Sequence, residues 1–342
     1  MNSSQHMDLL YPFVELFGLR IDHDLKLMET CQTPTRVCSR VLAALEPILS
    51  RERPDLILVQ GDTTTAMAGA LAGFHQRIPV GHVEAGLRSG NSYSPYPEEM
   101  NRQLITRLAT YHFAATAHNR DTLLSEGVAP ENIVVTGNPV VDALLTMLEC
   151  PTMTPAVTEL LETTQELKRI VLTTHRRESF GDVLAGNLRV LRGFVDRHED
   201  IALLFPVHPN PAVVAPATAI LSGHPRIHLL PPLKYQDFIA LLSRAWLLVS
   251  DSGGVQEEAP TLGKPLLVLR ENTERPEAAR AGVARLVGGD SASLEAMLES
   301  VYADDTWVRQ VRSIENPFGR GDSGKRIVEA ITELLSRPGE TP

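Results

Sequence analysis

Short apolar runs alternate with longer amphipathic segments along most of the chain. In the first half, the apolar runs cover residues 55–59, 78–83 and 133–135, and helical spacing covers residues 64–76, 97–108 and 140–148. In the second half, strands are predicted at residues 169–173, 201–206, 227–229, 246–250 and 265–269, with helices between them and a final helix over 323–335. This alternation predicts parallel sheets covered by helices on both faces, so the predicted fold class is α/β.

The alternation is interrupted once, near the middle of the chain. Residues 149–168 contain prolines, threonines and glutamates without a strong apolar stripe, and we interpret them as the interdomain region. The chain of 342 residues is also too long for one ordinary domain. We predict two Rossmann-like domains facing each other across a cleft, over residues 1–150 and 165–320, followed by a C-terminal helix and tail over residues 321–342.

Composition and charge narrow the class of protein. The formal net charge is −10 and no lysine- and arginine-rich run is present, which argues against a nucleic-acid partner. The three cysteines, Cys31, Cys38 and Cys150, form no C-x-x-C pair, which favours a reducing compartment over a disulfide framework or a zinc site. No apolar run reaches transmembrane length and the first residues show no signal-peptide pattern, so a cytoplasmic location without membrane contact is predicted.

A glycine pair follows the predicted strand 246–250, in the motif DSGGVQEEAP. Gly253 and Gly254 let a ligand approach the backbone, and the N–H groups at the start of the following helix suit a diphosphate. Glu258 lies four residues after Gly254 on the same helix face, where its carboxylate can accept hydrogen bonds from ribose hydroxyls. An N-capped helix with an acidic first turn has the same pattern, so this motif alone leaves both interpretations open.

Basic side chains follow other strands of the second half. His175 and Arg177, in HRRESFG, come directly after strand 169–173, where they can neutralise a leaving diphosphate. A solvated charged loop is the alternative interpretation. Arg275 follows strand 265–269 and can add positive charge to the same region, although a lone arginine is more often a surface residue.

Three carboxylates follow strand ends or begin a helix in the first half. Asp62 lies in GDTTT, Glu84 in GHVEAGLR and Glu98 in YSPYPEE, with Arg102 four residues after Glu98. Each has an ordinary explanation as a helix cap or a favourable charge in a first turn. Because the carboxyl ends of parallel strands meet at one rim, the three are expected to converge there, where crowding raises pKa values and prepares acids and bases.

The whole set of motifs resembles the non-hydrolysing UDP-N-acetylglucosamine 2-epimerases, which share a twin-Rossmann (GT-B) architecture with many glycosyltransferases. The motifs occur in the family's order and spacing: GDTTT, GHVEAGLR, YSPYPEE-x-NR, HRRESFG, VHPNP, DSGG-x-QEEAP, LGKP, NTERPEA and NPFG. Family members begin with a strand, a GTRPEA-type turn and helix, and a second strand. This sequence starts at a match to the end of that second strand, so its N-terminal domain is expected to lack the first strand and helix.

The resemblance implies a role for each matched residue. Asp62, Glu84 and Glu98 would be catalytic carboxylates, and His175 would assist the departure of UDP. The implied substrate-binding residues are Arg102, Arg177, Leu233 (through its backbone), Phe238, Ser252, Gly253, Gly254, Glu258 and Arg275. Gln5, His6 and His208, together with Arg177, match a second site at which substrate acts as an activator in bacterial relatives.

The resemblance also implies a reaction and partners. UDP is eliminated across C1–C2 of UDP-N-acetylglucosamine to give a 2-acetamidoglucal, and protonation from the opposite face with re-addition of UDP gives UDP-N-acetylmannosamine. No cofactor and no metal is expected, and the sequence has neither G-x-G-x-x-G nor H-E-x-x-H. A homodimer formed through the N-terminal domain is expected. Two alternatives remain open: an N-terminally truncated nucleotide-sugar binding protein with little catalysis, and a GT-B glycosyltransferase.

Overall fold

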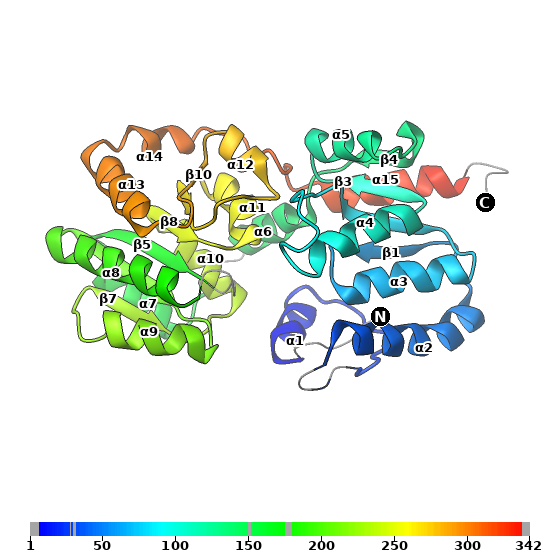
Figure 1. The fold of residues 1–342 in the computed structure, drawn as a ribbon, viewed down its shortest axis with the longest axis horizontal. Helices are drawn as coiled ribbons and strands as arrows, with labels where there is room; N and C mark the ends of the chain where they lie inside the picture. Colours follow the sequence, from blue (N-terminus) through cyan, green and yellow to red (C-terminus); the bar gives the residue numbers. More distant parts are fainter. Residues whose placement is uncertain (1–6, 28, 30–31, 150–151, 175–179, 337–342) are drawn as a thin grey trace. The chain divides into compact units, whose positions relative to one another are not determined.

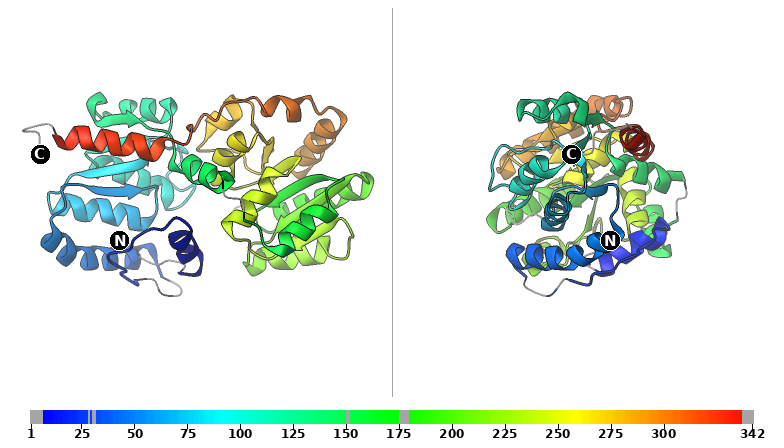
Figure 2. Two further views of the ribbon diagram at one scale, coloured as in Figure 1. Left: turned by 180° about the vertical axis from the view of Figure 1, so that it is seen from behind. Right: turned by 90° about the vertical axis from the view of Figure 1, so that its right-hand side faces the viewer.

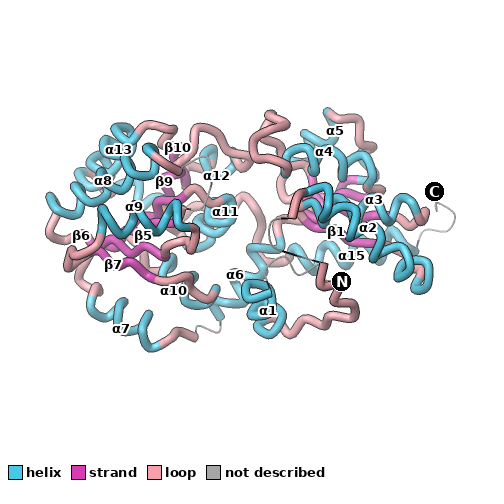
Figure 3. The backbone as a smooth tube through the Cα atoms, turned by 60° about the horizontal axis from the view of Figure 1, so that its bottom comes forward, coloured by secondary structure: helices cyan, strands magenta, loops and turns pink. Residues whose placement is uncertain are grey.

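The computed structural model describes residues 7–27, 29, 32–149, 152–174 and 180–336, and its backbone forms two compact units. Unit 1 comprises Met1–Asn138 together with Asp322–Pro342, and unit 2 comprises Pro139–Gly321. In each unit the strands form a core sheet with helices outside it, as the tube drawing in Figure 3 shows. The predicted α/β class with two parallel-sheet domains is therefore confirmed.

Unit 1 contains a four-stranded parallel sheet in the order β1-β2-β3-β4 (Figure 1). Its elements are α1 (Met7–Leu16), α2 (Pro34–Glu52), β1 (Ile57–Gln60), α3 (Thr64–His75), β2 (Val80–Ala85), α4 (Glu98–Leu108), β3 (Tyr111–Ala114), α5 (Ala117–Ser125), the 3-10 turn η1 (Pro130–Asn132), β4 (Ile133–Val135) and α15 (Ser323–Ser336). In the described part of this unit β1 is an edge strand, and its Leu58 side chain is 48% exposed, which is unusual for an apolar residue of a parallel sheet.

Helices cover both faces of the unit 1 sheet. On one face, Ile327 of α15 packs with Val83 and Phe113 of the strands. On the other face, α3 and α4 pack on the sheet, where Ile105 shares a buried cluster with Val80. The views agree, because α4 lies in front of the strands in Figure 1 and α15 lies in front of them in the left view of Figure 2.

Unit 2 contains a six-stranded parallel sheet in the order β10-β9-β8-β5-β6-β7. Its elements are α6 (Pro139–Glu149), α7 (Pro155–Thr163), β5 (Lys168–Thr173), α8 (Asp182–Arg197), β6 (Ile201–Pro206), α9 (Pro211–Leu221), β7 (Ile227–Leu230), α10 (Tyr235–Ser243), β8 (Leu247–Ser250), α11 (Gly253–Leu262), β9 (Leu266–Val268), α12 (Pro276–Arg280), β10 (Ala284–Leu286), α13 (Ser291–Ala303) and α14 (Thr306–Val311). The chain builds outward from β5 to β6 and β7, then returns to the other side of β5 with β8. The strand order therefore reverses between β5 and β8, which is where open α/β sheets bind ligands.

Unit 2 begins at Pro139, earlier than the predicted bound, and ends at Gly321, next to the predicted bound at residue 320. The sequence suggested a boundary near residue 150, whereas contacts divide the chain after Asn138. The reason is that α6 packs through Val141 and Leu144 into the core of unit 2. Conversely, α15 returns to unit 1, because Ile327 is buried against that sheet. Sequence patterning shows that a helix is amphipathic but not which sheet it covers.

Candidate active site

Asp62 lies in the turn that joins β1 to α3. Gly61 precedes it with a φ of 71°, a left-handed conformation that glycine adopts without a Cβ clash. The Thr63 side chain caps α3 by accepting a hydrogen bond from the Ala66 N–H. The Gly61 N–H donates to the Val83 carbonyl at 3.1 Å, and His82 Nε2 lies 2.9 Å from the Gly61 carbonyl oxygen. The turn that carries Asp62 is thus fixed by β2 on two sides.

His82 acts as a neutral donor in this arrangement. Its side chain is fully buried, and burial, with the nearby Arg88 and Arg102, lowers the pKa of His82 to about 4. A carbonyl oxygen only accepts hydrogen bonds, so Nε2 must carry the proton. His82 therefore holds Gly61 without contributing charge near pH 7.

Asp62 is paired with a buried arginine. Arg102 Nη2 and Nε approach Asp62 Oδ2 at 2.6 and 2.9 Å, and Arg102 Nη1 lies 3.1 Å from Glu99 Oε2. Arg102 and Glu99 are both buried, whereas the Asp62 side chain remains about one-quarter exposed. Asn101 Nδ2 also donates to the Asp62 carbonyl at 2.9 Å. Arg102 therefore holds Asp62 in place, a contact that the spacing of the motif did not predict.

Glu84, the last residue but one of β2, has an unusual backbone conformation. Its φ is 67°, in the left-handed region, and the pairing of β2 with β3 shifts register between Val83 and Ala85. A Cβ built on Gly61 would lie 3.5 Å from Glu84 Oε2, so this carboxylate lies next to the turn that carries Asp62. Non-glycine residues in this region cost about 1–3 kcal/mol each and concentrate at functional sites. Glu84 and the turn that carries Asp62 are therefore neighbours within unit 1, and the convergence of Asp62, Glu84 and Glu98 on one site stays a prediction.

Glu98 is the first residue of α4, and its side chain is half-buried. The next residue, Glu99, is fully buried and accepts a hydrogen bond from the Ser89 N–H at 2.9 Å. One helix start thus supplies a partly accessible carboxylate and, beside it, a structural one that anchors Arg102. The role predicted for Glu98 stays a prediction. The sequence analysis did not single out Glu99 and Asn101. No local pattern shows that they contact Arg102 and the Asp62 loop after β1.

The glycine motif of unit 2 lies where the strand order reverses. β8 ends at Ser250, and Ser252 leads into α11, which begins at Gly253. The neighbouring strand ends are joined by two side-chain hydrogen bonds, Thr173 Oγ1 to Ser250 Oγ at 2.5 Å and Thr174 Oγ1 to Asp251 Oδ2 at 2.8 Å. The N–H groups of a helix start are therefore presented at the position expected for an anionic ligand.

Arg275 lies beneath this helix start. A Cβ on Gly253 would lie 2.6 Å from Arg275 Nη1, so the guanidinium packs directly against the glycine. Arg275 Nε donates to Glu257 Oε1 at 2.6 Å and Nη1 donates to Glu274 Oε1 at 2.7 Å. All three side chains are buried, and Arg270 adds a further ion pair to Glu274 at 2.9 Å. Arg275 is thus part of a buried ion cluster that supports the glycine motif.

Gly253→Ala is expected to lower the free energy of unfolding of unit 2 by about 1–3 kcal/mol, because the added methyl group overlaps Arg275 in a packed site. Both tryptophans, Trp246 and Trp307, belong to unit 2, so urea unfolding followed by tryptophan fluorescence measures this directly. Gly254→Ala is the matched control, since its Cβ would meet Ser252 Oγ at an ordinary 3.8 Å. Equal stability of the two variants would contradict the packing explanation.

Glu258 lies on the same helix, buried at 4% exposure. Burial raises the pKa of Glu258 to about 7, against a hydrogen bond from the Tyr235 hydroxyl at 2.8 Å that favours the charged form. Leu233, ahead of α10, and Phe238, within α10, are half-buried and pack against the unit 2 core. Tyr235 was not predicted from the sequence.

The remaining predicted residues are Gln5, His6, His175, Arg177 and His208. Gln5, His6, His175 and Arg177 lie outside the described residues. His208 follows β6, is exposed, and its Nδ1 accepts a hydrogen bond from the Asn210 N–H at 3.2 Å.

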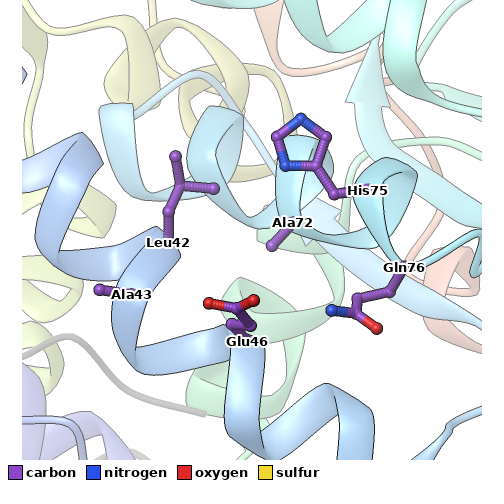
Figure 4. Close-up of a pocket in the computed structure, with 6 residues that line it drawn as sticks. All are labelled: Leu42, Ala43, Glu46, Ala72, His75 and Gln76. Carbon is purple, nitrogen blue, oxygen red and sulfur yellow. The ribbon is translucent and has the colours of Figure 1, made fainter.

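A surface pocket lies between α2 and α3 of unit 1, and Figure 4 shows the side chains around it. Its lining residues are Leu42, Ala43, Glu46, Ala72, His75 and Gln76. None of the predicted site residues is among them, so this pocket is separate from the strand ends that carry the carboxylates.

Among the described residues, no group of three or more histidine, cysteine, aspartate or glutamate side chains is arranged to hold a metal ion. No helix in the described part of the chain is long and apolar enough to cross a membrane.

Comparison with known proteins places these features in a family. The family model described as UDP-N-acetylglucosamine 2-epimerase matches residues 1–332. The UDP-N-acetylglucosamine 2-epimerase of Escherichia coli K12 is 43% identical over 334 residues, covering 96% of this chain and 89% of the relative. That of Bacillus subtilis is 40% identical over 329 residues, covering 96% and 86%. A crystal structure of the Neisseria meningitidis UDP-GlcNAc 2-epimerase bound to UDP-GlcNAc has a TM-score of 0.91 and 38% identity, covering 96% of this chain and 90% of that one.

Parallel α/β units with polar residues at the strand ends of one, and a glycine–helix loop at the strand reversal of the other, are typical of α/β enzymes that bind ligands at strand ends. Within that class, the chain belongs to the UDP-N-acetylglucosamine 2-epimerase family, a family of isomerases. The predicted family resemblance is confirmed.

Proposed function

We propose that this chain interconverts UDP-N-acetylglucosamine and UDP-N-acetylmannosamine. The observation that carries the proposal is the placement of two carboxylates in a chain of this family: Asp62 directly follows Gly61, and Glu84 lies beside the same turn. Asp62 is fixed by Arg102, and Glu84 is held in a left-handed conformation. A protein that only bound the nucleotide sugar would have no evident use for this arrangement.

The proposed reaction is an elimination followed by a re-addition. The C1–oxygen bond breaks and UDP departs with the bonding electrons, so positive charge develops at C1. A carboxylate then takes the proton from C2 and a C1–C2 double bond forms. A proton is then delivered to C2 from the opposite face, and a UDP oxygen adds to C1. The cycle is redox-neutral overall and consumes no co-reactant, so it calls for no nicotinamide.

Carboxylates of unit 1 are assigned to the sugar in this proposal. Asp62, Glu84 and Glu98 would stabilise positive charge at C1 and exchange protons at C2. Asp62 is partly exposed at the end of β1, and its position is set by the buried Arg102. We assign Arg102 to this positioning role in place of direct substrate contact.

Groups of unit 2 are assigned to the nucleotide. Ser252, Gly253 and Gly254 would bind the diphosphate through the start of α11, and Glu258 would accept hydrogen bonds from the ribose. Leu233 (through its backbone) and Phe238 would contact the uracil. Arg275 would complete the site by supporting the glycine loop, against which it packs at Gly253. The proposal also includes His175 and Arg177 at the diphosphate, and Gln5, His6 and His208 at a second, activating site.

The decisive experiment is incubation of the 342-residue chain with UDP-N-acetylglucosamine in D2O, with C2 of the sugar followed by NMR. We expect deuterium at C2 in both the recovered substrate and an emerging manno isomer, because the proton returned to C2 comes from solvent. Binding of UDP without exchange would favour the alternative of a nucleotide-sugar binding protein. Transfer of the sugar to an added acceptor, without the C2 epimer, would favour a glycosyltransferase.

We further propose that the chain acts in the cytoplasm as a homodimer formed through unit 1. Cys38, the cysteine whose side chain is described, is a free thiol, which supports a reducing compartment. Phe74 at the end of α3 is 59% exposed, so a substitution there is tolerated by the fold and can probe an interface of unit 1. Sedimentation of the wild-type chain beside Phe74→Glu tests the assembly.

A further inference from the structure

Tyr235 connects two parts of unit 2 that the proposed function assigns to different parts of the nucleotide. It is the first residue of α10, between Leu233 and Phe238, the residues assigned to the uracil. Its hydroxyl donates to Glu258 Oε1, on α11, at 2.8 Å. Glu258 is the residue assigned to the ribose. One hydrogen bond therefore joins the segment proposed to hold the base to the helix proposed to hold the sugar.

Because Glu258 is buried, the hydrogen bond from Tyr235 strongly affects its charged state. Glu258 is buried, and among the described residues the Tyr235 hydroxyl is the side-chain group that donates a hydrogen bond to its carboxylate. A hydrogen bond to a buried charged group contributes more than a neutral one, because the carboxylate has lost its water. Among the described residues, Glu257 on the same helix also interacts electrostatically with Glu258, and Arg275 donates a hydrogen bond to Glu257. Tyr235 is thus the donor from the facing element, α10.

We propose that Tyr235 is a positioning residue for nucleotide binding, which fixes the Glu258 carboxylate to α10 and so sets the spacing between the base-binding and ribose-binding elements. This inference rests on the proposed function. A nucleotide has a fixed distance between base and ribose hydroxyls, so a site whose two contacts are linked loses less conformational freedom when it binds. Tyr235 acts through Glu258 and does not itself need to contact the ligand.

A double-mutant cycle tests whether Tyr235 acts through Glu258. Tyr235→Phe is expected to weaken UDP binding, measured by calorimetry at pH 7.5, by about tenfold, because it removes a hydrogen bond to a charged group. In a Glu258→Gln background the same substitution is expected to change the affinity by less than about twofold, since the partner charge is already gone. Equal effects of Tyr235→Phe in both backgrounds would overturn the proposal.

The pH dependence gives a readout that a purely structural role would not move. The Tyr235 hydroxyl stabilises the charged carboxylate, so its removal raises the pKa of Glu258 above its value of about 7. UDP affinity should therefore fall, on acidification, at a higher pH in Tyr235→Phe than in the wild type. Ionisation of the UDP phosphate is common to both proteins and cancels in the comparison. An unshifted profile would count against the proposal.

Tyr302→Phe is the matched control, because it removes a tyrosine–carboxylate hydrogen bond of the same length, 2.8 Å to Asp200, in the same unit. It is expected to leave UDP affinity unchanged. Folding of each variant is checked by tryptophan fluorescence, which reports unit 2. If the wild-type chain epimerises and binds UDP but Tyr235→Phe binds equally well, this inference alone fails. If the wild-type chain does not bind UDP, the proposed function fails and the inference fails with it.

Discussion

Asp62→Asn is expected to lower kcat for C2 epimerisation by about 10²–10⁴-fold, the usual range for loss of a positioned acid–base group. The amide keeps the size of the side chain but removes the charge that faces the sugar in the proposed reaction. Because the nucleotide is assigned to unit 2, the dissociation constant for UDP should stay within about twofold of the wild type, by the logic that distant sites act independently. Coupled product assays with calorimetry measure both quantities.

The structure also supplies the control for this substitution. Arg102 keeps its ion pair to Glu99 when Asp62 is neutralised, so the buried guanidinium is not left without a carboxylate. Asp121→Asn removes an exposed ion pair to Arg120 in the same unit and should leave turnover unchanged. A fall in kcat of less than tenfold for Asp62→Asn, with the variant folded, would remove Asp62 from the proposed chemistry.

Arg275→Met is expected to destabilise unit 2 by about 3–5 kcal/mol at pH 8, the usual result of removing one partner from a buried ion pair. Arg275 bonds to Glu257 at 2.6 Å and to Glu274 at 2.7 Å, and all three side chains are buried. Glu274 retains Arg270, whereas Glu257 loses the guanidinium that opposes the effect of its burial. The uncompensated charge on the buried Glu257 then accounts for most of the lost stability.

The sign of the pH dependence follows from Glu257. Burial already raises the pKa of this carboxyl, and loss of Arg275 raises it further. A group with a raised pKa binds more protons in the folded state, so stability falls as pH rises through the folded-state pKa. The difference between Arg275→Met and the wild type should therefore shrink between pH 8 and pH 5. Urea unfolding followed by tryptophan fluorescence tests this, with Arg320→Met, from an exposed pair with Glu315, as the unaffected control.

Much of the fold could be predicted because its buried strands are short apolar runs. The predicted strands 133–135 and 201–206 coincide with β4 and β6, and the predicted helix at 64–76 corresponds to α3. β3 and β10 were missed. Tyr111–Ala114 follows α4 almost directly, and Ala284–Leu286 has only three residues with an arginine in the middle. Runs this short are strands because a neighbouring strand pairs with them, and local sequence does not contain that information.

The interdomain region was also more ordered than its composition indicated. It contains α7, whose Val157, Leu160 and Leu161 are buried in the unit 2 core. These positions have helical spacing, but three apolar residues in a short segment are a weak periodic signal. The assignment of α6 and α15 to their units was likewise beyond the sequence, because both depend on packing between distant segments.

The candidate site residues also fall into two groups, those that could be proposed from the sequence and those that could not. Residues at or just after strand ends, such as Asp62, Glu84 and Gly253, could be proposed from the sequence because parallel sheets place strand ends together. Their supporting partners were not found. Arg102 reaches Asp62 across 40 positions of the chain and Tyr235 reaches Glu258 across 23, and such contacts exist only once the fold is formed.

The backbone at Glu84 has a consequence for protein engineering. A glycine would adopt its φ of 67° without steric cost, so the residue that best relieves the local strain is also one without a carboxylate. Selection of variants for thermal tolerance alone would therefore favour the loss of a group that the proposed reaction needs. At this position a gain in thermal stability is expected to lower turnover, so a screen for stability also has to measure activity.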